Sequence, residues 1–259
     1  MRHLLLLLSI TILAACSQAE LLQKFASAEE QALAKSYIDR LRMRDFDVIE
    51  KAADPSISGP SLREALIKMA DVVPSQAPVS VKLVGAHSFR ATDIQTLNTT
   101  FEYDYGGKWL LANVVMQEKN GVKTIVGFNI YPRSESLEVE NRFTLAGKRP
   151  AQYLLLTAAI AAMLVTIYSL VVCIRTKLPG RKWPWVLFIL VGFGRLAVNW
   201  NSAEWGFVPL SVQLFSAGAM APLYGPWTIY VSVPLGAVLF LLRHRKSRLG
   251  TPSEDAPAT

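Results

Sequence analysis

The chain has 259 residues and a formal net charge of +7 at pH 7. That length allows one soluble domain together with a membrane part. The charge is uneven, because residues 1–149 hold 18 Lys and Arg against 17 Asp and Glu, whereas residues 150–259 hold 9 against 3. The C-terminal cations bracket apolar segments and form no stripe with interleaved aromatic residues, which argues against nucleic-acid binding.

The first fifteen residues have the pattern of a secretory signal peptide. Residues 1–3 form a short basic start, and residues 4–13 form an apolar core that is followed by small residues. This apolar run is too short to cross a hydrocarbon core of about 30 Å, so we expect a cleaved signal and not an uncleaved anchor.

Residues 13–16, with the sequence Leu-Ala-Ala-Cys, resemble a bacterial lipobox. The resemblance implies that the signal is removed before Cys16, whose sulfur then carries a diacylglycerol and whose amino group receives a fatty acid such as palmitate. The mature lipoprotein would begin at Cys16, fixed to a membrane outside the cytoplasm. The alternative is an ordinary secretory signal in which this cysteine has no special role.

The second cysteine, Cys173, lies in an apolar segment and is interpreted as a small apolar residue of a helix. Because Cys16 and Cys173 are not expected to meet, the sequence predicts no disulfide and no redox site. It also contains no cluster with metal-ligand spacing, no glycine-rich phosphate loop and no G-x-S-x-G motif. We therefore expect neither a metal nor another cofactor.

Three helices are predicted after a short N-terminal tether. Ser27 and Glu30 have the spacing of a capping box, and apolar residues then recur at helical spacing to about residue 44. A second, short helix ends near Pro55, and a third covers residues 61–73. The domain therefore begins with helical structure.

Beyond Pro78 the apolar period changes to two, which is typical of strands. The candidate strands are residues 79–90, 97–105, 109–118 and 122–131. The pairs Gly106-Gly107 and Asn120-Gly121 stand where tight hairpin turns need positive φ angles. We expect the last three strands to form an antiparallel meander.

Helices followed by a curved antiparallel sheet resemble the cystatin-like cone, and residues 34–131 resemble the nuclear transport factor 2-like superfamily. Residues 37–47 look like the opening helix and following turn of lipoproteins in that group. The resemblance implies an α+β domain, residues 16–132, with N-terminal helices packed on a curved four-stranded antiparallel sheet. It also implies a pocket between sheet and helices, which serves catalysis, ligand binding or only dimerisation in relatives.

Enzymes of that superfamily place acid/base groups and tyrosines in the cone, so three residues are candidates here: His87, Tyr103 and Tyr105. Strand parity predicts that both tyrosines point inward, whereas Glu102 and Asp104 lie on the solvated polar face. His87 shares its parity with apolar residues and is also expected to point inward, where it could transfer protons beside a buried tyrosine. The alternative is a histidine at the sheet edge or hydrogen-bonded in the core, without a catalytic role.

The C-terminal part, residues 151–248, is predicted to be an all-α membrane region of three transmembrane helices. Residues 151–174 carry no charged side chain and are long enough to cross the hydrocarbon core. Two further spans are predicted at residues 183–200 and 224–242. The first span also has a row of small residues that permits close helix packing, namely Ala158, Ala159, Ala161 and Ala162.

Two basic clusters set the expected orientation in the bacterial inner membrane. Residues 175–182 and 243–248 each hold four Lys or Arg and should face the cytoplasm. Residues 201–223 contain no Lys or Arg and are predicted to be an external segment, extended, re-entrant or interfacial. The N-terminal domain would then lie outside, with the tail, residues 249–259, in the cytoplasm.

Arg195 is the one charged residue inside a predicted span. An intramembrane charge is costly and by default indicates a function or a partner. Its long side chain could instead reach the outer headgroups, because the residue lies near the end of the span. Reaching the headgroups, pairing within a helix interface and a role in transport or sensing are the three interpretations.

Residues 133–150 are predicted to be an ordered hinge that holds the exported domain close to the bilayer. The leading hypothesis is a non-enzymatic inner-membrane lipoprotein whose domain binds a protein, peptide or lipid partner. It would belong to an envelope complex, either with another membrane protein or as a homo-oligomer. The alternatives are a small-molecule or lipid-acting enzyme that uses the cone pocket, and an accessory subunit in signal transmission across the membrane.

Overall fold

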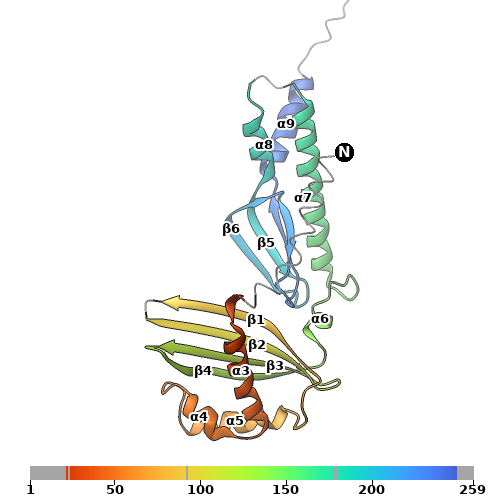
Figure 1. Cartoon of the computed structure of the whole chain (residues 1–259). Helices are drawn as coiled ribbons and strands as arrows, with labels where there is room; N and C mark the ends of the chain where they lie inside the picture. Colours follow the sequence, from red (N-terminus) through yellow and green to blue (C-terminus); the bar gives the residue numbers. More distant parts are fainter. Residues whose placement is uncertain (1–21, 23, 92, 178–179, 250–259) are drawn as a thin grey trace, which may run out of the picture. The chain divides into compact units, whose positions relative to one another are not determined.

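The computed structural model describes residues 22, 24–91, 93–177 and 180–249 (Figure 1). The chain divides into two compact units, Met1–Glu140 and Asn141–Thr259. The predicted signal peptide and Cys16 lie outside the described residues, as does the C-terminal tail from residue 250.

Unit 1 begins with the three helices that the sequence predicts: α3 (Ala28–Arg42), α4 (Phe46–Ala52) and α5 (Pro60–Val72). The capping box is confirmed, since the Ser27 hydroxyl accepts the Glu30 amide at 3.2 Å while the Ser27 amide donates to the Glu30 carboxylate at 2.8 Å. These bonds satisfy backbone donors that have no partner inside the helix.

A four-stranded antiparallel sheet follows, with strands in the order β1 (Ser80–Ala91), β2 (Ile94–Asp104), β3 (Trp109–Lys119) and β4 (Val122–Arg133). The meander is therefore confirmed, and β1 extends it by one strand. Both predicted turns have positive φ angles, for example 52° at Asn120 and 76° at Gly121. A short helix, α6 (Leu137–Glu140), ends the unit.

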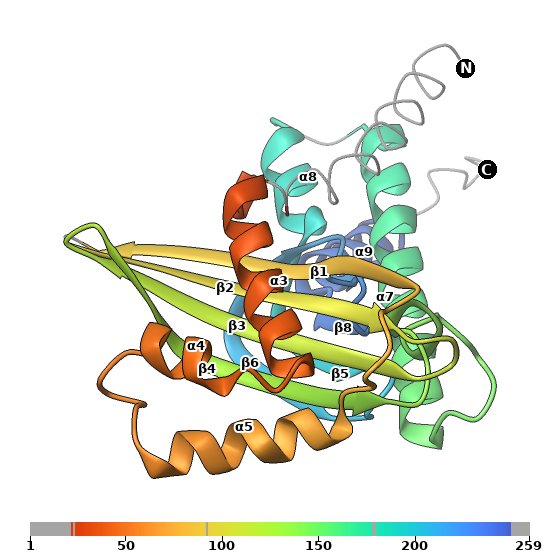
Figure 2. The same cartoon turned by 60° about the horizontal axis from the view of Figure 1, so that its bottom comes forward.

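The core of unit 1 lies between the three helices and one face of the sheet, which α3 crosses (Figure 2). Ile38 and Leu41 of α3 and Leu66 of α5 are buried against Phe101 and Val114 of the sheet. The predicted α+β class, with N-terminal helices on a four-stranded antiparallel sheet, is thus confirmed for this unit.

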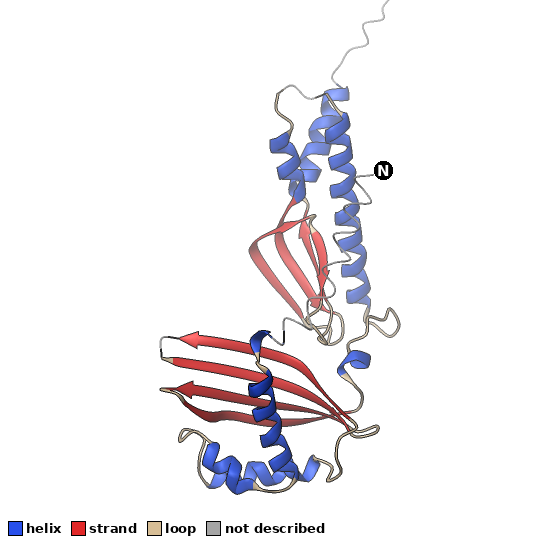
Figure 3. Ribbon diagram, viewed as in Figure 1, coloured by secondary structure: helices blue, strands red, loops and turns tan. Residues whose placement is uncertain are grey.

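Unit 2 has a different fold from the predicted three-helix membrane region. Of the described helices, only α7 (Pro150–Arg175) is long and apolar enough to cross a membrane. The rest of the unit mixes helix and strand (Figure 3), with α8 (Trp183–Leu190), β5 (Val191–Asn199), β6 (Trp205–Leu214), β7 (Ala217–Met220), β8 (Thr228–Val233) and α9 (Leu235–Leu249).

The prediction of second and third transmembrane helices is wrong because each segment contains helix-breaking residues. In residues 183–200, α8 gives way to β5, where Gly194 has a φ angle of +68°. In residues 224–242, Pro234 separates β8 from α9, since proline cannot donate the backbone bond that a helix interior needs. Residues 201–223 are extended as expected over β6, but that segment is a strand of a sheet.

The four strands of unit 2 form an antiparallel sheet in the order β6-β5-β8-β7. One face packs on α7, where Leu155 and Ala159 contact a cluster that includes Val198 and Ile229. A second cluster joins α8 and α9 to α7, which contributes the free, buried Cys173. The segments α8–β5 and β8–α9 therefore both run along α7.

Candidate functional site

The three catalytic candidates of unit 1 do not come together. The β1 strand has a bulge between Leu83 and Gly85, which shifts the parity so that Ala86 is buried and His87 is exposed. The predicted inward orientation of His87 is therefore wrong. His87 pairs with Asn98, five residues before Tyr103, which corresponds to about 17 Å along a strand.

Tyr103 and Tyr105 point inward as predicted and are packed in the core. Their ring centroids lie 6.2 Å apart in a stacked arrangement, and the two residues are only 3% and 5% exposed. Burial raises the pKa of Tyr103 far above its ordinary value, and the nearby Asp39 carboxylate raises it further. Burial also raises the pKa of Tyr105, so both side chains are neutral phenols at physiological pH.

The carboxylates on the opposite face of the sheet have structural partners. Glu102 is 6% exposed, in contrast to the predicted solvated position, and its carboxylate accepts the Leu137 amide at 2.6 Å. Asp104 accepts the Gly106 amide at 2.8 Å and so stabilises the hairpin turn. Each carboxylate therefore stabilises the local backbone by accepting an amide hydrogen bond, and neither forms a site with the tyrosines.

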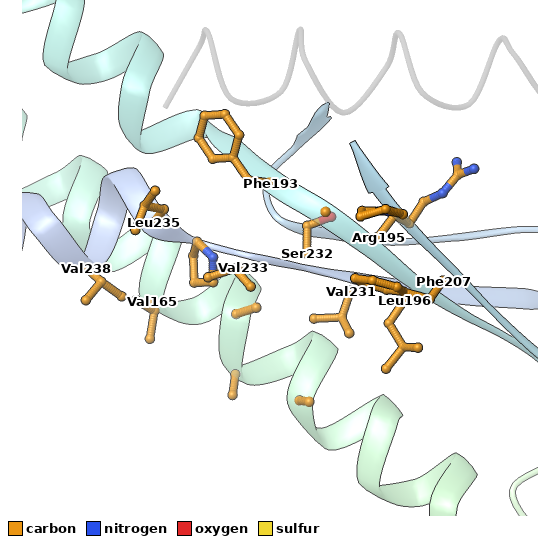
Figure 4. A pocket seen from close by; sticks show the side chains of 16 residues that line it. Val165, Phe193, Arg195, Leu196, Phe207, Val231, Ser232, Val233, Leu235 and Val238 are labelled. Atoms are coloured by element: carbon orange, nitrogen blue, oxygen red, sulfur yellow. The ribbon is translucent and has the colours of Figure 1, made fainter. Parts of the chain in front are cut away.

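Unit 2 contains an apolar groove between α7 and the sheet, which we call the α7 groove. It comprises two neighbouring pockets of about 830 Å³ and 520 Å³, which share Ala158, Leu196 and Val231. Figure 4 shows the side chains that line the larger pocket, which come from α7, β5, β6, β8 and the start of α9.

Small side chains and a strand bulge open the groove. Ala158, Ala161 and Ala162 of α7 line it, whereas Ala159 of the same helix is buried against the sheet. The predicted row of small residues therefore faces the sheet in part and the groove in part. Opposite, the register of β5 shifts between Phe193 and Arg195 in its pairing with β6, and between Phe193 and Leu196 in its pairing with β8.

The two cations of the groove lining differ in position. Arg149 is exposed beside the smaller pocket, at the N-terminal end of α7. Arg195 lines the larger pocket but is also exposed, and its guanidinium points away from the apolar side chains in Figure 4. The guanidinium carbon lies 6.0 Å from the centroid of the Tyr230 ring, a cation–π contact.

One end of unit 2 is basic. The Lys182 ammonium donates to the Ile174 carbonyl oxygen at 3.0 Å, which places the loop before α8 at the C-terminal end of α7. The Arg243 guanidinium of α9 lies 5.4 Å from the ring centroid of Trp185 in α8. Both basic segments of the sequence therefore meet at the same end of the unit.

The opposite end is aromatic. Phe143 stacks on Trp200 with ring centroids 5.2 Å apart and meets Trp227 edge-on at 5.8 Å. The Trp200 indole donates to the Thr144 carbonyl oxygen at 2.7 Å. Tyr153 of α7 contacts Trp200 as well, so the start of α7 is surrounded by aromatic rings.

Comparison with protein-family models, with curated proteins and with solved structures gives no match. Within the described part of the chain, no group of three or more His, Cys, Asp or Glu could hold a metal ion.

The sequence does not predict the α7 groove. Three strands, β5, β6 and β8, line the groove, and they lie in segments whose composition favours transmembrane spans or an external loop. The glycines of β5 and Pro234 were the available signals against continuous helices.

Proposed function

We propose that the protein is a non-catalytic bacterial inner-membrane protein whose N-terminal unit lies outside the cytoplasm and binds a protein, peptide or lipid partner. One observation carries the membrane assignment: unit 2 has a basic end and an aromatic end, separated by the length of α7. The 26 residues of α7 extend about 39 Å, enough for a hydrocarbon core of about 30 Å.

The charge distribution supports the orientation. Cytoplasmic segments of membrane proteins are rich in Lys and Arg, and tryptophan and tyrosine concentrate at the membrane interfaces. Lys182 and Arg243 lie at the end where α7 finishes, and Trp200 and Trp227 at the end where it begins. α7 would therefore cross from outside to inside, with unit 1 on the outer side.

The exposed side chains of unit 2 support contact with lipid. On α7, Leu154, Leu164 and Tyr168 are 75%, 61% and 61% exposed. On β6, Leu210 is 96% exposed. Large exposed apolar patches are rare on soluble monomers and mark a membrane or protein interface.

The edge of the unit 2 sheet supports assembly with a partner. β6 is an edge strand, and the sheet lies beside the part of α7 that would be in the hydrocarbon core. Open sheet edges are not found facing lipid, because unpaired backbone groups cost several kcal/mol each there. A membrane protein partner or a second copy of the chain would cover this edge.

The proposal that the protein is not an enzyme rests on where the candidate catalytic residues lie in unit 1. His87 is exposed and distant along the sheet from the two buried tyrosines, whose raised pKa values keep them protonated and therefore unable to accept a proton at neutral pH. The three helices on a four-stranded antiparallel sheet are consistent with the nuclear transport factor 2-like resemblance, and binding is one of the roles that this resemblance implies. Lipidation at Cys16 would give it a second attachment.

Cysteine accessibility in intact cells tests the orientation. Lys108→Cys, in an exposed turn of unit 1, and Lys246→Cys, on α9, would be labelled with a membrane-impermeant maleimide in spheroplasts. We expect labelling at residue 108 without permeabilisation, and at residue 246 only after it. The reverse pattern, or release of the protein from membranes by alkaline carbonate, would refute the proposal.

A further inference from the structure

We propose that the α7 groove binds one acyl chain of an anionic phospholipid, with the phosphate beside Arg149. The inference rests on the proposed function, because it needs the groove to face the outer leaflet. It names a ligand for unit 2 that is separate from the partner of unit 1.

The length of the groove fits a hydrocarbon chain. From Arg149 to Val165 the lining of α7 extends over sixteen residue steps, about 24 Å. One leaflet of the hydrocarbon core is about 15 Å deep, half of the whole core. A chain that starts at the outer end of α7 would therefore remain in the groove across its leaflet.

The chemistry of the lining favours an anionic lipid. Apart from Arg149, Gln152, Arg195 and Ser232, the described residues that line the two pockets are apolar, and none is acidic. Gln152 is occupied, since its amide donates to the Trp200 carbonyl oxygen at 2.7 Å. Arg149 is the cation among the described residues that line the outer end of the groove, where a phosphate would lie.

Arg195 marks the inner part of the groove. Its guanidinium extends away from the apolar side chains, toward the ring of Tyr230. The acyl chain would therefore contact the apolar stem of Arg195 and not its charge. This assigns the headgroup contact to Arg149, because the Arg195 guanidinium points away from the groove.

Photolabelling tests the groove directly. The full-length protein would be reconstituted in phosphatidylcholine vesicles with a small fraction of phosphatidylglycerol that carries a diazirine in one acyl chain. After irradiation, mass spectrometry should find label on peptides containing Ala158, Ala161 and Leu196. Label confined to other surfaces would overturn the proposal.

Two pairs of variants sharpen this experiment. Ala158 is exposed and lines both pockets, so Ala158→Trp fills the groove without displacing core atoms, and should reduce groove labelling at least fivefold. Ile167→Trp, on an exposed position of the same helix outside both pockets, should leave it unchanged. Equal labelling of both variants and wild type would overturn the proposal.

Arg149→Gln tests the charge. Wild type should be labelled several-fold more by the diazirine phosphatidylglycerol than by the matched phosphatidylcholine, and Arg149→Gln should lose this preference. Arg243→Gln, at the basic end of the unit, should retain it. Equal labelling of wild type by the two lipids would overturn the anionic assignment. Carbonate extraction separates lipid binding in the groove from the membrane assignment: a protein that stays in the membrane with an unlabelled groove refutes only the lipid binding, whereas release refutes both.

Discussion

The side-chain amide of Gln152, in the first turn of α7, donates a hydrogen bond of 2.7 Å to the carbonyl oxygen of Trp200, directly after β5. Gln152 is only 2% exposed and Trp200 is fully buried. The contact joins the start of α7 to the end of β5, the strand that runs back along α7. It therefore fixes the position of β5 against α7, and with it one wall of the groove.

Replacing Gln152 with leucine should destabilise unit 2. The substitution removes the donor and leaves the buried Trp200 carbonyl without this bond, which costs about 1–3 kcal/mol. Thermal unfolding of the detergent-solubilised chain, followed by near-UV circular dichroism, measures the loss. Thr157→Val, which removes an exposed bond within α7, should change the unfolding free energy by less than about 0.5 kcal/mol. Equal effects of the two variants would contradict this prediction.

Gly192→Ala should be more destabilising than Gly206→Ala. A Cβ atom at Gly192 would lie 2.8 Å from the Ser216 Cα and from the Ser232 Cβ, and the strands would have to separate. Overpacking of this kind costs about 1–3 kcal/mol. At Gly206 a Cβ atom would meet nothing within 4 Å. The unfolding free energies of the two variants, measured in one detergent, compare the sites, and a smaller effect at Gly192 would be evidence against the close packing of β5 on its neighbours.

The buried tyrosines make stability sensitive to alkaline pH. Burial, with the Asp39 carboxylate second, raises the pKa of Tyr103 above its ordinary value of 10.0. A raised folded-state pKa contributes stability below about pH 10, which is lost as the pH rises and the unfolded chain ionises. Tyr103→Phe should therefore lose less stability than wild type between pH 8 and pH 11 in denaturant titrations. Tyr131→Phe, at an exposed position, should follow wild type; a Tyr103→Phe curve parallel to wild type would count against the buried phenol.

A photo-crosslinking amino acid at Leu210 should capture a protein in the native membrane. Leu210 lies on the edge strand β6 and is 96% exposed, so a chain that covers this edge would be within reach. Denaturing gel electrophoresis would show the adduct, and mass spectrometry would identify either another membrane protein or a second copy. The same amino acid at Lys108 is the control. Absence of any protein adduct at Leu210 would exclude a covered edge.

Metabolic labelling with a radioactive fatty acid tests the lipobox. The native chain should incorporate the label, and Cys16→Ser should not, because only the cysteine sulfur accepts the diacylglycerol. The Cys173→Ser variant is the matched control and should be labelled like the native chain. An unlabelled native chain would leave the ordinary secretory signal as the interpretation.

Local sequence signals were sufficient for most of unit 1. The capping box at Ser27 fixed the start of α3, and the Gly106 and Asn120 pairs fixed two hairpins, because each depends on residues that are neighbours in sequence. Strand parity correctly predicted the burial of Tyr103. It failed at His87, because a bulge inserts one residue in β1 and reverses every later side chain.

In unit 2 the sequence by itself determined less. Its charges and hydropathy predicted α7 and the two basic segments, because these properties depend on composition alone. It did not determine that the remaining segments mix strand with helix, since Gly194 and Pro234 interrupt runs that are otherwise apolar enough for spans. Only the tertiary structure decided that Ala158 faces a groove and that Gln152 meets Trp200, because both depend on how β5 is aligned with α7, and residues so far apart in sequence carry no local signal of that alignment.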